Sequence, residues 1–334
     1  MGDVETFVEL RPWLFGVAYR MLGVAAEAED VLQDAYLRWA SVDDSSVESP
    51  RAYLTTIVTR LSIDQLRAAK VGRGSYKGPW LPEPIEAGSG GAGSGEVGSG
   101  GLGSGGLGSG AGVEPGPEAG VVLADSLSLA FLVLLEELAP AERAAFLLRE
   151  VFGYEYSEIA RMLERNEPAC RQLVSRARHR VGDRRKRFEA DHEQSRELTR
   201  RFVFACGTGD IEGLMSLLAE DVVVWTDGGG KATSAPRPVV GPWRAARFLV
   251  HVAKTFPNAT VGEMTLNGQP GLIFEENGRV TSAVVIDVLD GKIAGIRVVA
   301  NPEKLTALQR RFKDEWVSGL RELTNRGRTD PGSP

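Results

Sequence analysis

The amino-acid sequence predicts a multidomain protein with two all-α helical domains followed by an α+β domain. Apolar residues recur at helical spacing in residues 5–70 and again in residues 125–187. A long Gly/Ser-rich tract lies between these two segments. After residue 193 the pattern changes to β-rich runs separated by Asn-Gly and Asp-Gly pairs, which are the preferred two-residue hairpin turns.

Composition limits the classes of protein to consider. The chain has 334 residues and a net charge of −6, so two or three domains are expected. No apolar run approaches the roughly 18 residues that a membrane span requires, and no secretory signal begins the chain. Cys170, Cys206 and the three histidines are too scattered for a disulfide framework or a metal site. We expect a cytoplasmic protein without membrane contact, metal or cofactor.

Three apolar stripes predict three helices in the first segment, and Ser49-Pro50 marks the start of the third. The stripes are Leu10, Leu14, Val17 and Met21; Val31, Leu32, Ala35, Tyr36 and Trp39; and Tyr53, Leu54, Ile57, Val58 and Leu61. The second helix begins with Glu27, Glu29, Asp30 and Asp34. The helix dipole favours acids there, and an acidic docking face for a basic partner is the alternative interpretation.

The third helix carries arginines together with the hydroxyls of Thr55, Thr56, Thr59 and Ser62. This side could follow a nucleic-acid strand, with Tyr53 or Trp39 stacking on a base. The alternative is that these aromatic side chains belong to the core.

The segment after the third helix contains three prolines in six residues, PWLPEP from residue 79 to 84. Proline fixes φ and disfavours helix before it, so this segment is predicted to be extended. Because Trp80 and Leu81 would be exposed in a free linker, we expect them to dock in a groove. Residues 88–112 are Gly/Ser-rich and cannot build a core; as a flexible coil they span roughly 25–30 Å. Whether this tract is native stays open.

Residues 154–187 predict a helix-turn-helix. Ser157 can cap a short helix, Asn166 can cap the next, and Glu164 stands where the turn often has Gly. Residues 161–187 contain ten basic and three acidic residues, which concentrates positive charge as phosphate binding requires. A solvated Arg-rich helix face is the alternative. Helices are also predicted at residues 125–138, with Asp125 as cap, and at residues 140–152 before Gly153.

The C-terminal part predicts helices at residues 193–206, 210–219 and 243–256 and a strand at residues 221–227. Four further strands are expected at residues 259–266, 271–276, 279–289 and 292–300. Helices followed by a four-strand meander indicate an α+β domain. A helical tail is expected from residue 302 to about residue 323.

Several of these stretches resemble a known family. AYRMLG (residues 18–23), EDVLQDA (29–35) and RAYL (51–54) resemble region 2 of an extracytoplasmic-function (ECF) sigma factor, and residues 134–181 resemble its region 4. The third part resembles the cone-shaped, SnoaL-like α+β roll. WLPEP (80–84), DGGGK (227–231) and NPEKL (301–305) resemble the subgroup with a fused SnoaL-like C-terminal domain. The sequence departs from the family at Ala139, where a capping Ser is usual, and in the length of its Gly/Ser tract.

The resemblance implies an alternative sigma factor, not an enzyme, that binds core RNA polymerase and directs promoter-specific transcription initiation. Residues 41–53 and the helix after them would capture a flipped base of the −10 element. The residues implied in polymerase binding are Asp30, Val31, Gln33 and Asp34. Those implied in binding −35 or −10 promoter DNA are Arg171, Gln172, Ser175, Arg176, Arg178, Arg51, Tyr53 and Arg60.

The resemblance also implies that the SnoaL-like domain regulates the sigma factor in cis, by docking residues 80–84 near residues 227–231 and 301–305. The Gly/Ser tract would let region 4 move while that docking holds. The interdomain residues are then Trp80, Leu81, Pro82, Glu83, Pro84, Asp227, Gly228, Gly229, Gly230, Lys231, Asn301, Pro302, Glu303, Lys304 and Leu305.

The expected domains are residues 1–75 (region 2), 76–122 (linker), 123–187 (region 4), 193–308 (α+β roll) and 309–334 (tail). The alternative function is a DNA-binding regulator whose roll senses a small ligand or acts as an isomerase or cyclase. Asp227, His251 and Asp287 are the acid or base groups available to such an enzyme. The sign of the regulation and the identity of any small ligand stay open.

Overall fold

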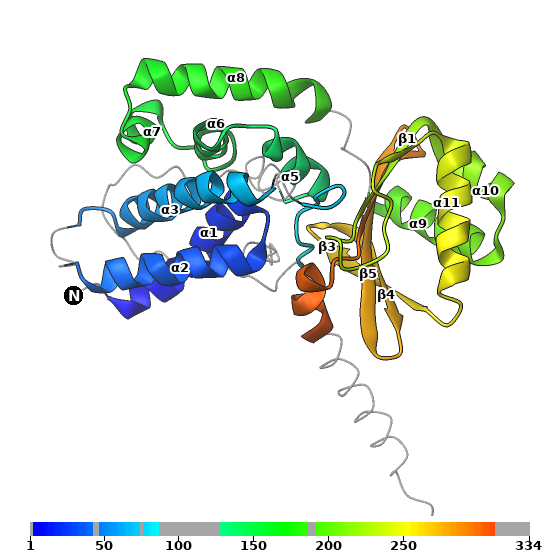
Figure 1. The fold of residues 1–334 in the computed structure, drawn as a ribbon. Coiled ribbons are helices and arrows are strands. Elements are labelled where there is room, and N and C mark those ends of the chain that lie inside the picture. The colour runs from blue at the N-terminus through cyan, green and yellow to red at the C-terminus, as the bar shows by residue number, and fades with distance from the viewer. Residues whose placement is uncertain (1–2, 43–46, 74–75, 87–126, 186–191, 311–334) are drawn as a thin grey trace, which may run out of the picture.

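The computed structural model describes residues 3–42, 47–73, 76–86, 127–185 and 192–310, which form three units (Figure 1). The N-terminal unit contains α1 (Val4–Leu22), α2 (Ala25–Ala40) and α3 (Pro50–Arg73). The central unit contains α5 (Leu129–Glu136), α6 (Pro140–Phe146), the π-helix η2 (Leu147–Val151), α7 (Tyr156–Leu163) and α8 (Glu167–Arg185). The third unit is the roll, residues 192–310. The predicted fold class, two helical domains followed by an α+β roll, is confirmed.

Helix ends in the N-terminal unit follow local chemistry. The carboxylate of Asp3 accepts hydrogen bonds from the amides of Glu5 and Thr6 at 3.2 and 3.0 Å, so α1 begins there. α1 ends at Gly23, whose φ of 72° is left-handed. α2 begins after Val24, whose side chain cannot cap it.

Two nucleic-acid interpretations of this unit are wrong. Trp39 is fully buried, and its Nε1 donates to the carbonyl oxygen of Asp3 at 2.8 Å, so this ring belongs to the core. The hydroxyls of Thr55, Thr59 and Ser62 are also buried instead of lining an open groove. The periodic pattern located the helix correctly, but it could not tell which neighbour covers each side of it.

The helix-turn-helix forms in the central unit with one altered cap. Asn166 caps α8 as predicted, because its Oδ1 accepts from the amide of Ala169 at 2.9 Å. Glu155 is the N-cap of α7, and its amide donates to the side chain of Glu158 at 2.8 Å; Ser157 lies inside the first turn and is not the cap. Glu164 takes the left-handed conformation, with φ of 52°, at the position where a Gly is common. Ser128 caps α5, and Asp125 lies outside the described residues.

The roll contains α9 (His192–Thr208), α10 (Ile211–Leu217), β1 (Leu218–Asp227), β2 (Val239–Val240), α11 (Pro242–Thr255), β3 (Thr260–Leu266), β4 (Gln269–Glu276), β5 (Arg279–Leu289), β6 (Lys292–Val299) and the 3-10 helix η3 (Pro302–Leu305). The sheet order is β2-β1-β6-β5-β4-β3. The predicted meander β3–β6 is antiparallel, whereas β1 pairs with β6 in parallel, which places the first and last long strands side by side. The two-residue strand β2 was not expected. Residues 306–310 continue the helical tail, and its expected continuation to residue 323 lies outside the described residues.

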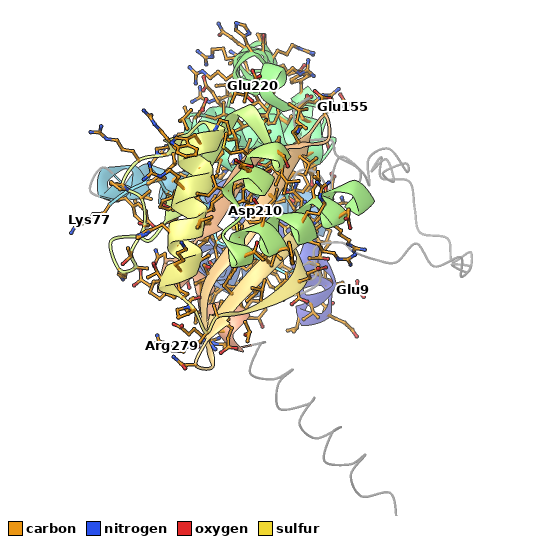
Figure 2. All side chains as sticks on the ribbon, turned by 90° about the vertical axis from the view of Figure 1, so that its right-hand side faces the viewer. Glu9, Lys77, Glu155, Asp210, Glu220 and Arg279 are labelled. Atoms are coloured by element: carbon orange, nitrogen blue, oxygen red, sulfur yellow. The ribbon has the colours of Figure 1, made fainter. Side chains whose placement is uncertain are left out.

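The sheet stands between two layers. Its helices α9, α10 and α11 cover one face, and the helical units lie beyond the other (Figure 1). Figure 2 looks onto the α11 side and shows Arg279 at the tip of the hairpin that joins β4 and β5. The core under the helices is separate from the core on the opposite face, and the latter includes Leu81 and Leu129 from outside the roll. Among the described helices, none has the length and apolarity needed to cross a bilayer.

Candidate functional site

Residues 76–86 form an extended strap that connects the roll to the N-terminal unit. The extended backbone is what the prolines predict. Leu81 is 1% exposed and lies in the core of the sheet face that the strap covers. The isolated bridge between Glu86 and Leu266 adds the end of the strap to the edge strand β3. The strap therefore belongs structurally to the roll, although residues 87–191 separate the two in sequence.

The carboxylate of Asp227 is the centre of the strap–roll contact. It is fully buried at the end of β1, and its Oδ2 accepts from the amide of Leu81 at 2.9 Å and from Lys304 at 2.7 Å. Its Oδ1 accepts from the hydroxyl of Tyr76 at 2.5 Å and from the amide of Gly229 at 3.0 Å. A buried carboxylate is stable only when paired and hydrogen-bonded, and both conditions are met here.

Lys304 closes this contact from the opposite side. Its ammonium group lies 4.2 Å from the ring centroid of Trp80 and 5.1 Å from that of Tyr76, and it also donates to the carbonyl oxygen of Leu81. The cation thus has a carboxylate, a carbonyl and two aromatic faces around it. Burial, together with the bond to Asp227, raises the pKa of Tyr76, so its hydroxyl stays a donor.

The glycine turn after Asp227 provides the space for this contact. Gly229 has φ of 58°, and a Cβ there would lie 2.4 Å from Nδ2 of Asn301. Asn301 in turn donates to the Tyr76 hydroxyl at 3.0 Å. Lys231 and Glu303 form an exposed ion pair across the rim. The structure therefore brings residues 80–84, 227–231 and 301–305 together. The other expected interdomain residues in the last two segments are Gly228, Gly230, Pro302 and Leu305.

The other side of the strap contacts the turn between α1 and α2. The amide of Glu83 donates to the carbonyl of Gly23 at 2.8 Å, and its carbonyl accepts from the hydroxyl of Tyr19 at 2.7 Å. Its side-chain Oε2 accepts from the amide of Ala25 at 2.8 Å and so supplies the N-cap that α2 lacks. A Cβ at Gly23 would lie 2.8 Å from the ring of Trp80, so this approach requires glycine. Burial raises the pKa of the Glu83 carboxyl. Pro82 and Pro84 are buried between these contacts.

Asn267 is a contact residue that the sequence reasoning missed. It was interpreted only as the first residue of a hairpin turn, and it does occupy that turn between β3 and β4 with φ of 52°. Its side chain is also buried and bonded to the strap, to Tyr19 and to Leu127. The Asn-Gly pair in the sequence does not indicate that the Asn267 side chain is buried and bonded to other units, because burial depends on residues distant in sequence.

The residues expected to contact polymerase lie on α2. Asp30, Gln33 and Asp34 are exposed on one side of the helix. Val31 is 3% exposed and packs in the helical core, so it is not part of this surface. The correction follows from helical spacing, since Val31 shares its face with Leu32 and Ala35.

The residues expected to contact the −35 element lie along the free side of α8. Gln172 and Ser175 are exposed. The three arginines are exposed but have carboxylate partners: Arg171 with Glu167 at 2.9 Å, Arg176 with Glu142 at 3.2 Å and Arg178 with Glu150 at 2.7 Å. The Arg171–Glu167 pair is exposed on both sides and contributes only about 0–1 kcal/mol, whereas the carboxylate of Glu142 is buried and that of Glu150 is half-buried.

The residues expected near the −10 element differ from one another in exposure and in partners. Arg60 is half-buried, and it donates to the carbonyls of Met162 and Arg161 at 2.8 and 3.2 Å and pairs with Glu164 at 2.8 Å. Arg51 is exposed and stacks on the ring of Trp13 at 3.7 Å. Tyr53 is half-buried, with its ring 6.0 Å from that of Trp39. Residues 43–46 of the expected base-capturing segment lie outside the described part.

The two helical units share one apolar core. Phe152 of the central unit packs edge-on against Trp13 at 4.8 Å between ring centroids. Thr55 accepts from the hydroxyl of Tyr154 at 3.1 Å and from Trp13 at 3.2 Å. Arg143 is buried and donates to the carbonyl of Met21 and to Glu136, both at 2.7 Å. The face of α3 that carries Thr55 and Arg60 is therefore covered by the central unit.

The acid and base groups considered for an enzyme do not converge. Asp227 is occupied by its strap contacts, and Asp287 forms a buried ion pair with Arg297. Burial lowers the pKa of Arg297 to about 9. His251 is exposed on α11, which packs on the sheet face opposite to the strap. Within the described ranges, no three His, Cys, Asp or Glu side chains gather as metal ligands.

Comparison with known families gives two matches in the helical part. Residues 6–71 match Sigma-70 region 2, and residues 128–181 match Sigma-70, region 4. These ranges contain most of α1–α3 and most of α5–α8 respectively.

Relatives and solved structures extend the similarity across the roll. The chain is 34% identical over 319 residues to "ECF RNA polymerase sigma factor SigJ" of Mycobacterium tuberculosis (strain ATCC 25618 / H37Rv), covering 91% of this chain and 93% of that one. It is 29% identical over 299 residues to "Probable ECF RNA polymerase sigma factor SigI" of Mycobacterium tuberculosis (strain CDC 1551 / Oshkosh), covering 90% and 93%. The crystal structure of the Mycobacterium tuberculosis extracytoplasmic function sigma factor SigJ superposes with a TM-score of 0.66 at 32% identity, covering 91% of this chain and 98% of that one.

Proposed function

Because the chain belongs to the extracytoplasmic-function sigma factors and directs promoter-specific transcription initiation, we propose that its C-terminal roll regulates this activity in cis. The roll restrains the sigma factor by holding the strap against region 2 (α1–α3). The observation that carries this proposal is the strap itself, since residues 80–85 bond to the roll on one side and to the α1–α2 turn on the other. A tethered domain needs only modest contacts for this task, because tethering raises its effective concentration.

The partners of the active form are core RNA polymerase and promoter DNA. The acidic, exposed side of α2, with Asp30, Gln33 and Asp34, suits a basic polymerase surface. The free side of α8 suits the major groove of the −35 element, where Arg and Gln contacts to base edges are worth about 1–3 kcal/mol each. The −10 element would be engaged by region 2, through Arg51, Tyr53 and the start of α3.

The packing of region 4 (α5–α8) on region 2 supports a restrained state. Thr55 and Arg60, on the region 2 side, are bonded to Tyr154 and to the end of α7. The −35 and −10 elements are separated along the DNA duplex. Regions 2 and 4 cannot bind both elements while they are packed against each other. Transcription therefore requires region 4 to leave region 2, and the roll opposes that step through the strap and through its contacts with Leu127 and Leu129.

The test is run-off transcription with core polymerase, comparing the full chain with Lys304→Met. Loss of the ammonium group removes the bonds to Asp227 and to the Leu81 carbonyl, so the strap is released and transcription should rise several-fold. Lys231→Met is the matched control, because it removes an exposed cation of the same site and should leave transcription unchanged.

A chain ending at Arg187 and a pull-down on core polymerase complete the test. Restraint predicts that the truncated chain binds core polymerase at least as well as the full chain and transcribes more. If Lys304→Met and the truncation both lower transcription, the roll is an activator and the proposed restraint is wrong. If neither form binds core polymerase, the polymerase contact itself is wrong.

A further inference from the structure

The described side-chain bonds of Asn267 in the roll reach the strap, region 2 and the start of region 4 together. Its Oδ1 accepts from the amide of Ile85 at 3.0 Å. Its Nδ2 donates to the hydroxyl of Tyr19 at 2.6 Å and to the carbonyl of Leu127 at 3.1 Å. Its own amide donates to the carbonyl of Ile85 at 2.7 Å, and the residue is 1% exposed.

These bonds bring together two points that are distant in sequence. Ile85 is near the end of the strap, and Leu127 is the first described residue of region 4 after residues 87–126. Both are held by the same carboxamide group. The chain therefore leaves the strap and re-enters region 4 at a single place on the roll, the turn between β3 and β4.

The chemistry of the carboxamide makes these contacts interdependent. One carboxamide offers an acceptor oxygen and two donor hydrogens, and all three are used here. When one partner leaves, a buried polar group loses its hydrogen bond, and that loss is more costly than the bond itself contributes. Partial release is consequently disfavoured relative to release of all partners together.

The backbone of the turn does not explain the burial of Asn267. Asn277 starts the next hairpin turn, between β4 and β5, with almost the same φ of 55°. Its side chain is exposed. Both positions favour Asn because it tolerates the left-handed region, so any further role of Asn267 lies in its side-chain contacts.

We propose that Asn267 is a positioning residue that couples release of the roll from region 2 to release of region 4. This inference rests on the proposed restraint by the roll. In the restrained state the carboxamide holds Tyr19, the strap and Leu127 in one arrangement. When the roll leaves the strap, the Leu127 contact is lost in the same event, and region 4 becomes free to separate from region 2.

The experiment measures two distances in the full chain with pairs of spin labels. Labels at Leu37 on α2 and Arg247 on α11 report the roll against region 2, and labels at Leu37 and His179 on α8 report region 4 against region 2. All three positions are exposed. Cys170→Ala and Cys206→Ala provide the background, which must give single distances for both pairs.

Asn267→Gly removes the three side-chain bonds and keeps a residue that adopts positive φ easily. We expect the separated fraction to increase about ten-fold for both label pairs, as the loss of buried hydrogen bonds implies. Asn277→Gly is the matched control and should change neither pair. Tyr19→Phe removes one of the three Asn267 side-chain bonds and also the bond to the Glu83 carbonyl, and it should shift both pairs in the same direction as Asn267→Gly.

The coupling is wrong if Asn267→Gly separates only the roll, or only region 4, or neither. Failure of the coupling can be distinguished from failure of the proposed function. If both distances change while transcription stays constant, the coupling holds and the regulatory role of the roll is wrong. If transcription responds to Lys304→Met but the two distances respond independently to Asn267→Gly, the regulation holds and the coupling is wrong.

Discussion

The strap meets the roll through Leu81 and through hydrogen bonds to a buried ion pair of the roll, whereas regions 2 and 4 meet mainly through a shared apolar core. At the strap, Asp227 and Lys304 are buried and face each other at 2.7 Å, with Tyr76 and the Leu81 amide completing the site. Between regions 2 and 4, the side chains of α1, α3, α5 and α6 form one continuous cluster. Arg20 lies in this cluster against Phe152, and burial lowers its pKa to about 9.

This difference between the polar strap contact and the apolar interface determines how each of them can be opened. A buried charge that loses its partner is strongly disfavoured, so a polar contact responds sharply to a single change. An apolar interface distributes its stabilisation over many atoms, so each change has a graded effect. The strap contact is therefore suited to act as a switch. The apolar interface between regions 2 and 4 is the contact that this switch keeps closed or allows to open.

The largest effect is expected from Asp227→Asn. The substitution keeps the shape but leaves Lys304 buried without a counter-charge, which should weaken strap docking by about 3–5 kcal/mol. Hydrogen exchange at the Leu81 amide, which donates to Asp227, measures this directly. Asp221→Asn is the control, since Asp221 lies exposed on the same strand. Equal exchange in both variants would show that the charge pair does not hold the strap.

A smaller effect is expected from Phe152→Ala. The ring is half-buried and contacts Trp13 and Arg20, so its loss should weaken packing of region 4 on region 2 by roughly 1–3 kcal/mol. Spin labels at Leu37 and His179 should report a broader distance distribution. Phe248→Ala removes an equally half-buried ring within the roll and should leave that distance unchanged. A broadening in Phe248→Ala alone would contradict the comparison.

The smallest effect concerns pH and Glu83. Burial raises the pKa of this carboxyl in the docked state; nearby Glu27 acts in the same direction, while the amides of Ala25 and Ala26 and the charge of Lys304 oppose it. A raised acid pKa means that the docked state binds the proton more tightly than the released state. Docking should therefore strengthen as pH falls through this pKa and weaken as pH rises through it.

Glu83→Gln separates the pH effect from the cap. Glutamine keeps an acceptor for the Ala25 amide but cannot titrate, so the label distance between Leu37 and Arg247 should lose the pH dependence that the raised pKa of Glu83 produces. Glu83→Ala loses the cap as well, which costs about 1 kcal/mol. A pH dependence that survives in Glu83→Gln would assign the titration to another group.

Local patterns in the sequence were sufficient for most elements. Apolar spacing located α1, α2 and α3, Asn166 marked the start of α8, and the Asn-Gly and Asp-Gly turns separated the strands of the meander. The strand β2 and the parallel pairing of β1 with β6 were not predictable in this way. They depend on which segments meet across long stretches of chain, and a short window of sequence carries no such information.

Burial produced the other differences. Val31, Trp39 and Thr55 were considered for contacts with polymerase or nucleic acid, yet each lies in the core. Their residue types fit both roles, and only the neighbouring helices decide between them. Glu83 shows the converse, since its cap on α2 joins residues that are 58 positions apart.

The sequence by itself determined the helices, the hairpin turns and the family, because these depend on residue type and short spacing. The tertiary structure alone decided which polar groups become buried partners. Asp227 with the Leu81 amide, Glu83 with the start of α2, and Asn267 with Tyr19 and Leu127 are partners because the strap lies between the roll and region 2. The physical reason is that hydrogen bonds act over about 3 Å, so these pairs exist only after distant segments have been brought into contact.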